Sequence, residues 1–314
     1  MSHAAFITCD SGFWEKLDGF YDIGKFTLIP CKFLEKSQQT GRSYFVLKFN
    51  FKGDFDSDNL GNWAVNLGKA IEEAKIFTAW MSTITRRYLD LTHTDLGVGQ
   101  EFGPSHILKP SETIDESILE KVFHIGSDKK TGVFYSIDRP NYSSLAFKEF
   151  PHSLNLPLDV KEYTDKLYSL PKRERDKFID ACFSYQFSRQ NSPRLPSVSL
   201  VALVNCVEIM MRDEVTSGYC KNAKKRCPLK KDVIVKFRRF FEDNLSYPLP
   251  PEKKRFLDDC YRSRSNFVHR ALLGDGPLRG PKYLSLGRDD KVSNQLYELE
   301  TLVNAGLIEW LSKI

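Results

Sequence analysis

The sequence lacks the short motifs that mark many large enzyme classes. Its 314 residues contain no Walker A phosphate loop, no GxGxxG turn after a strand-like segment, no GxSxG nucleophile turn, and no HExxH or CxxC metal motif. It also lacks a long hydrophobic run, because the stretch from Val198 to Met211 is interrupted by Ser, Asn and Glu and is well short of the roughly 20 residues of a membrane span. Candidate chemistry therefore has to be sought in a less common set of residues.

Targeting signals and paired cysteines are also missing. The first residues, MSHAAFITCDSGFW, contain neither a basic segment nor a sustained apolar one, so we expect no signal peptide and a cytoplasmic protein. The seven cysteines are irregularly spaced, which is typical of free thiols in a reducing compartment. Cys220 and Cys227 are the one suggestive pair, but a structural zinc site usually has two tighter pairs. We predict no metal and no cofactor; zinc held by this pair with Cys206 or Cys260 remains an alternative.

Positive charge is scarce in the first half of the chain and concentrated in the second. Residues 1–150 hold 17 Lys and Arg against 20 Asp and Glu, whereas residues 151–314 hold 29 against 21. The densest stretch, residues 219–239, has nine basic residues and one acid, Asp232. Such a run is either a solvated surface or a polyanion site. Its candidate RNA-binding residues are Lys221, Lys224, Lys225, Arg226, Lys230 and Lys231.

The first half of the sequence has the pattern of a small mixed α+β domain, residues 1–150. Aromatic and β-branched residues predict strands over 20–29 and 44–51, joined by a hairpin-type connection at 36–42. A period of three to four predicts a helix from Trp63 to Ile84. Glycines and prolines predict a loop or irregular edge over 92–115, and two more strands are expected at 131–137 and 143–147. We expect a sensing or regulatory role for this domain, with an unknown ligand.

The second half of the sequence predicts an all-α domain over residues 157–314, beginning after the proline-bounded segment 151–157. The chain is thus α+β overall. Residues 197–211 are apolar nearly all round, as expected for a central helix, and Glu208 is the only charge among them. The six expected helices cover residues 160–170, 172–189, 197–212, 230–245, 251–271 and 292–313.

An Arg/His cluster lies near the end of the predicted helix 251–271. Arg262, Ser265, Asn266 and His269 are spaced at i, i+3, i+4 and i+7, which places them on one polar stripe. Arg264 and His269 are five residues apart, or about 140° around a straight helix. The two side chains can therefore meet on one phosphate only if the helix bends or ends there, or if a second subunit contributes.

These residue types suit RNA cleavage without a metal. An arginine can fork onto a phosphate and stabilise transition-state charge, and a histidine can transfer a proton near neutral pH. Together they suit attack of a ribose 2′-OH on its own phosphodiester, which is impossible in DNA. The alternative is structural: His269 caps the helix C-terminus or bonds a neighbour such as Glu208.

The segment Leu257–Leu273, LDDCYRSRSNFVHRALL, resembles the closing motif of HEPN domains, particularly the ApeA-like group. That motif has Arg-Ser-x-x-Val-His after a Tyr a few residues upstream; Arg264 and His269 match it with four residues between them. The helix Leu200–Met211, with Glu208, is similar to the helix that precedes the motif. The resemblance implies a dimeric, metal-independent endoribonuclease, often a toxin or antiviral effector. Arg264 would contact the scissile phosphate and His269 would be the general acid/base, supported by Arg262, Ser265, Asn266 and Glu208.

The sequence departs from the HEPN pattern at two positions. Ser265 follows the arginine where many active members have Asn or another strongly polar residue, although Ser is common in the ApeA-like group. Arg270 replaces the small residue, usually Gly, that often follows the histidine. Some HEPN domains are non-catalytic modules for dimerisation and for binding RNA or protein, and this is the alternative function. In either case the expected partners are RNA and a second copy of the chain, with no membrane and with a phage-derived or other trigger for the N-terminal domain.

Overall fold

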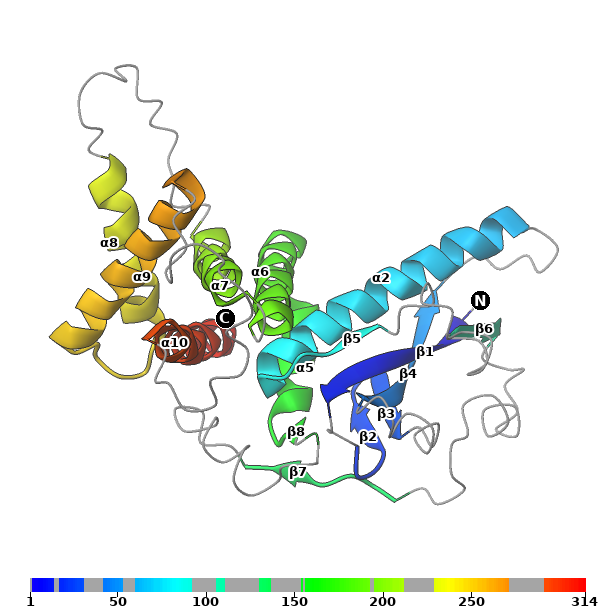
Figure 1. The fold of residues 1–314 in the computed structure, drawn as a ribbon. Coiled ribbons are helices and arrows are strands. Elements are labelled where there is room, and N and C mark those ends of the chain that lie inside the picture. The colour runs from blue at the N-terminus through cyan, green and yellow to red at the C-terminus, as the bar shows by residue number, and fades with distance from the viewer. Residues whose placement is uncertain are drawn as a thin grey trace. The chain divides into compact units, whose positions relative to one another are not determined.

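The computed structural model describes residues 2–13, 17–30, 42–52, 60–91, 106–110, 130–136, 154, 156–192, 195–211, 229–270 and 291–314. The chain divides into two compact units, Met1–Ser169 and Leu170–Ile314, which we call the N-terminal unit and the helical unit. The N-terminal unit is built on an antiparallel sheet, and the described part of the helical unit contains helices alone (Figure 1). The predicted α+β class is confirmed.

The main sheet of the N-terminal unit is centred on two long strands, β1 (Ser2–Phe13) and β4 (Arg42–Lys52), which pair antiparallel. The described strands run in the order β2-β3-β4-β1-β5, and β6 (His106–Pro110) also pairs with β1. The short strand β5 (Asp90–Leu91) and β6 pair with consecutive parts of the same edge of β1. Ala5, Ile7 and Cys9 alternate into the core, as the period of two requires.

The predicted strand 20–29 is in fact two strands, β2 (Tyr21–Ile23) and β3 (Phe26–Pro30). Gly24 adopts φ 65°, in the left-handed region that favours glycine, and the chain turns there. Lys25 follows in the turn and lies 2.5 Å from Glu73 and 3.8 Å from the ring of Tyr168. β3 pairs antiparallel with β4, as the predicted hairpin-type connection requires. The expected loop or irregular edge over 92–115 contains the strand β6, which pairs with β1, after a stretch that holds three glycines and Pro104.

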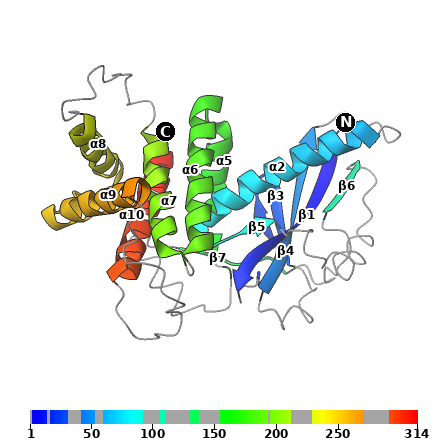
Figure 2. The same cartoon turned by 45° about the horizontal axis from the view of Figure 1, so that its top comes forward.

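One long helix, α2 (Leu60–Thr85), covers a face of this sheet and contacts β1 and β5 (Figure 2). Its N-terminal half is partly exposed, whereas residues 78–85 are buried on every side. Polar residues are tolerated there because they bond to the helix's own carbonyls: Ser82 Oγ donates to Thr78 O at 2.8 Å and Thr85 Oγ1 to Met81 O at 2.6 Å. This burial stabilises the helix, which the periodicity predicted from Trp63 to Ile84.

The helix α5 (Val160–Ser169) belongs to the N-terminal unit, so the division between units falls later than the predicted segment 151–157. It packs against β2, and Thr164 Oγ1 accepts a 2.8 Å hydrogen bond from Trp80 Nε1 of α2. A two-stranded parallel sheet, β7 (Phe134–Tyr135) with β8 (Leu156–Pro157), lies in the same unit. The expected strand 131–137 is thus much shorter, and the expected strand 143–147 lies outside the described residues.

The described part of the helical unit contains five helices, whose bounds agree with the predicted ranges within two residues. They are α6 (Lys172–Asn191), α7 (Pro196–Met210), α8 (Leu229–Asn244), α9 (Pro251–Arg270) and α10 (Lys291–Lys313). The central helix is α7, as predicted, because it contacts each of the other four. Its Leu203, Val204 and Val207 are fully buried. α8 and α9 lie side by side, and the C-terminal half of α9 lies near the end of α7 (Figure 1).

Candidate functional site

The candidate site is formed where two pairs of side chains at i, i+3 spacing face each other. Tyr261 and Arg264 are on α9, and Asn205 and Glu208 are on α7. Leu257 and Cys260, earlier on α9, are fully buried and hold the helix against the bundle. Arg264 lies on the same side as Leu257 because seven residues make almost two turns. The apolar stripe of α9 thus continues into a polar contact near its end.

The carboxylate of Glu208 accepts hydrogen bonds from two side chains of α9. The Tyr261 hydroxyl donates to Oε1 at 2.9 Å, and Arg264 Nη2 donates to Oε2 at 2.7 Å. Arg264 Nη2 also lies 3.5 Å from Asn205 Oδ1, at the limit of a hydrogen bond. The side chains of Arg264 and Glu208 are 20% and 26% exposed, so the pair is open to solvent on one side. Sequence reasoning selected Glu208 for being a charge on an apolar helix, and the structure explains that charge by its partners.

Burial, the charge of Glu208 and the hydrogen bond to Glu208 together raise the pKa of Tyr261 to about 12, against a lowering by Arg264. The hydroxyl is therefore protonated at neutral pH and acts as a donor to the carboxylate. The Tyr261 ring is tilted against Phe237, with centroids 5.4 Å apart, and Phe237 is fully buried. Tyr261 is the tyrosine upstream of the HEPN-like motif, but no role in the site was predicted for it, and Asn205 was not selected. Nothing in the spacing of Tyr261 shows that its hydroxyl reaches a residue 53 positions away.

The structure describes the side chains of only two of the other predicted residues on α9, Arg262 and Ser265, and neither joins this cluster. Arg262 points away from it: its side chain is 62% exposed and pairs with Asp259 at 3.2 Å. Ser265 is half-buried, with no described contact to Glu208 or Arg264. Asn266 and His269 belong to the backbone of α9, but their side chains lie outside the described residues. α9 stays helical from Arg264 through His269, so the two residues are separated by about 140° and about 7.5 Å along the axis.

Only the last part of the basic stretch 219–239, from residue 229, lies within the described residues. Lys221, Lys224, Lys225 and Arg226 lie outside the described residues, and Lys230 and Lys231 are in the first turn of α8 with undescribed side chains. Further along α8 and α9, cations are paired between helices. Lys254 lies 2.7 Å from Glu242, and Arg238 Nε lies 3.1 Å from Asp258 Oδ1 as an ion pair, although its alignment does not meet hydrogen-bond geometry. These pairs weaken the positive field of that surface.

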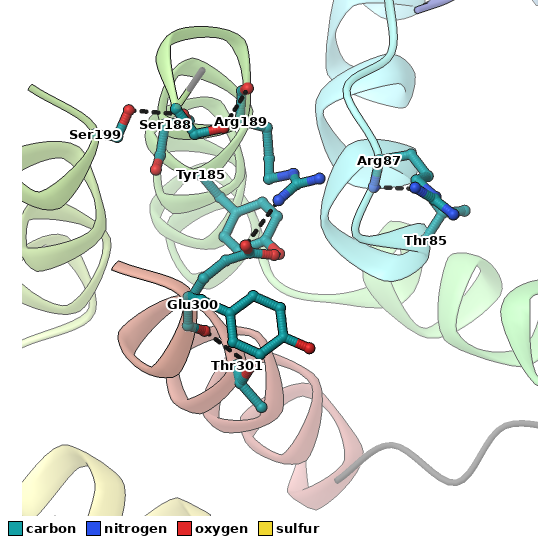
Figure 3. Close-up of polar contacts among 10 residues, drawn as sticks. Thr85, Arg87, Tyr185, Ser188, Arg189, Ser199, Glu300 and Thr301 are labelled. Atoms are coloured by element: carbon teal, nitrogen blue, oxygen red, sulfur yellow. Dashed lines mark hydrogen bonds and ion pairs between the residues drawn. The ribbon is translucent and has the colours of Figure 1, made fainter. Parts of the chain in front are cut away.

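A second cluster in the helical unit has the same composition, but its carboxylate and its tyrosine are buried. Tyr185 and Arg189 of α6 point toward Glu300 of α10 (Figure 3). The Tyr185 hydroxyl donates to Oε1 of Glu300 at 2.8 Å, and Arg189 Nη1 donates to Oε2 at 2.7 Å. The Glu300 side chain is only 7% exposed, so this carboxylate joins two helices rather than facing solvent.

Metal ligation by the thiols finds little support among the described side chains. Burial raises the pKa of Cys206 well above its usual range, and it raises that of Cys260 to about 12. A zinc ligand must be deprotonated, which these environments oppose. No group of three or more His, Cys, Asp or Glu side chains in the described residues could hold a metal. Cys220 and Cys227 lie outside those residues, so the zinc alternative keeps only its sequence argument.

No helix among the described residues is long and apolar enough to cross a membrane. No protein-family model matches the sequence, and neither a curated protein nor a solved structure is similar enough to count as a match.

Proposed function

We propose that the helical unit is a HEPN-type endoribonuclease that needs no metal. In this proposal Arg264 binds the scissile phosphate and His269 transfers the proton. The attacking ribose 2′-OH loses its proton and displaces the 5′-oxygen, which takes up a proton, leaving a 2′,3′-cyclic phosphate and a 5′-hydroxyl. The observation that carries the proposal is a guanidinium fixed by Glu208 yet 20% exposed, on the helix that presents His269 after four further residues.

The separation of Arg264 and His269 around α9 favours a site shared by two subunits, each supplying one of these residues. The basic stretch around Lys224 would hold the RNA backbone, so affinity should fall steeply with salt.

In this proposal the protein is a cytoplasmic toxin or antiviral effector. The N-terminal unit, with its own sheet and its own core, senses a trigger or restrains the nuclease. The trigger is phage-derived or of another origin, and the RNA cleavage assay does not depend on which of these it is.

The test is cleavage of total RNA by the purified full-length chain in excess EDTA. Wild type should cut, and His269→Ala should lose about 10²- to 10⁴-fold in rate while keeping its circular dichroism spectrum. Arg264→Lys should also lose activity because lysine keeps the charge without the fork. Arg255→Ala, an exposed arginine of the same helix, is the matched control and should cut normally. Equal rates for wild type and His269→Ala would refute the catalytic assignment.

A non-catalytic module that binds RNA or protein is the second candidate, and the Glu208–Arg264 ion pair favours it, since the carboxylate competes with phosphate for the guanidinium. This function predicts RNA binding that is lost when Lys224, Lys225 and Arg226 are replaced by Ala. It also predicts no cleavage at any protein concentration, with end-group analysis finding no cyclic phosphate.

A further inference from the structure

The hydrogen bonds that Arg264 makes to described residues come from one nitrogen, Nη2. Its Nη2 donates to Glu208 and reaches toward Asn205, both on α7. Its Nε is buried and, within the described residues, has no hydrogen-bond partner. A guanidinium carries five N–H donors in a rigid plane, so fixing one edge fixes the direction of the other. Whatever sets the position of the Glu208 carboxylate therefore also sets the plane in which Arg264 meets a ligand.

The position of that carboxylate is set by Tyr261. Glu208 uses its two oxygens separately, Oε1 for the tyrosine hydroxyl and Oε2 for the arginine. Because a carboxylate is planar, the hydrogen bond at Oε1 restricts where Oε2 can point. The tyrosine is itself anchored, since its ring packs on the buried ring of Phe237. The contacts thus run from the core through Tyr261 and Glu208 to Arg264.

The cluster on α6 and α10 provides a comparison within the same unit. Tyr185, Glu300 and Arg189 repeat the same two hydrogen bonds, but Glu300 is 7% exposed (Figure 3). Glu208, by contrast, is 26% exposed and lies beside the helix that carries His269. The two arginines are exposed alike, 21% for Arg189 and 20% for Arg264, so the clusters differ at the carboxylate. The cluster whose carboxylate meets solvent is therefore the one on the helix that carries His269.

We propose that Tyr261 is a positioning residue for Arg264, acting through Glu208 to hold the guanidinium in the orientation that meets the scissile phosphate. The inference rests on the proposed function, since it assigns a role in the same reaction. Tyr261 touches no substrate and moves no proton in this scheme. Its removal should therefore disturb the transition-state contact of Arg264 and leave the binding of the RNA backbone unchanged.

The first test separates kcat from KM for RNA cleavage. Tyr261→Phe keeps the ring against Phe237 and removes only the hydroxyl; it should lower kcat between about tenfold and a hundredfold and leave KM within about twofold. Glu208→Gln should behave alike. The matched control is Tyr185→Phe, which removes the same hydroxyl from the buried cluster; it should lower stability without changing kcat per folded molecule. A Tyr261→Phe enzyme with the kcat of wild type would overturn the positioning role.

The second test does not need activity. In ¹⁵N-labelled protein, the guanidinium nitrogens of Arg264, assigned with the Arg264→Lys variant, should give separate resonances because the bond to Glu208 restrains their rotation. Tyr261→Phe should merge or broaden them; unchanged separate resonances would overturn the inference. If wild type cuts no RNA, the proposed function fails, while this measurement still decides whether Tyr261 positions Arg264.

Discussion

Arg264 Nη2 lies 2.7 Å from Glu208 Oε2, and Arg189 Nη1 lies at the same distance from Glu300 Oε2. Both ion pairs are completed by a tyrosine hydroxyl on the other carboxylate oxygen. They differ in the exposure of the carboxylate, 26% for the Glu208 side chain and 7% for that of Glu300, whereas the two arginines are alike at 20% and 21%. The two ion pairs have the same distance, but their carboxylates are buried to different extents. Comparing them therefore separates the contribution of each pair to stability from its contribution to function.

Removing the carboxylate should destabilise the helical unit more at Glu300 than at Glu208. Glu300→Ala removes a carboxylate that is only 7% exposed and leaves the buried Tyr185 hydroxyl without this acceptor, which should cost about 3 kcal/mol. Glu208→Ala should cost about 1–2 kcal/mol because water reaches the site and screens the charge. Native-state hydrogen exchange of the amides in α6 and α10, and in α7 and α9, measures the two losses separately. Equal losses would show that exposure does not distinguish the two clusters.

The raised pKa of Tyr261 predicts a pH dependence of stability above neutral pH. The folded-state pKa is about 12, against 10.0 for an unperturbed tyrosine. Below pH 10 both states keep the proton and the contribution to stability is complete. Between pH 10 and pH 12 the unfolded state loses its proton first, so the free energy of unfolding falls as pH rises.

The measurement for this pH dependence is the difference in unfolding free energy between wild type and Tyr261→Phe from about pH 9 to about pH 11. Subtracting the variant removes the contributions of other tyrosines, and the difference should shrink as pH rises. A difference that is constant with pH would contradict the assignment of this shift to Tyr261.

The hydrogen bond between Trp80 and Thr164 should secure α5 to the N-terminal unit. Both residues are buried, and Thr164 Oγ1 accepts from the indole Nε1 at 2.8 Å. Thr164→Val keeps the shape and removes the acceptor, which should cost about 1–3 kcal/mol. Thr164→Ser keeps the hydroxyl and loses only a methyl group, so it should cost less. Urea unfolding followed by Trp fluorescence compares the two, and a larger loss for the serine variant would contradict the role of the bond.

The helical half of the fold could be predicted closely because its signals are local. Pro196 and Pro251 begin α7 and α9, and apolar residues recur at helical spacing within each helix. The sheet was harder to predict. Gly24 divides one aromatic stretch into two strands. The short strand β6 is stabilised by pairing with β1, which lies about a hundred residues earlier in the chain.

The candidate site could be predicted in its residue types but not in its connections. Arg264 and Glu208 stand out in the sequence, one by motif and the other as a charge on an apolar helix. Their contact depends on how α9 crosses α7, which no spacing within either helix determines. Tyr261 shows this most clearly, because a half-buried tyrosine on an amphipathic helix normally indicates packing alone. Its role becomes visible only with the position of Glu208.

The angle between Arg264 and His269 on α9 gives the sharpest test of a shared site. If each site takes its arginine from one subunit and its histidine from the other, a mixed dimer of Arg264→Ala and His269→Ala chains contains one site with both residues intact. Random re-pairing makes half of the dimers mixed, so the mixture should recover about a quarter of wild-type RNA cleavage. Each variant alone should remain inactive, and the doubly substituted chain mixed with wild type supplies the control for re-pairing. A mixture as inactive as its components, with re-pairing verified by mass, would place Arg264 and His269 of the same subunit in each site. That result would require α9 to bend or unwind before His269 when RNA binds.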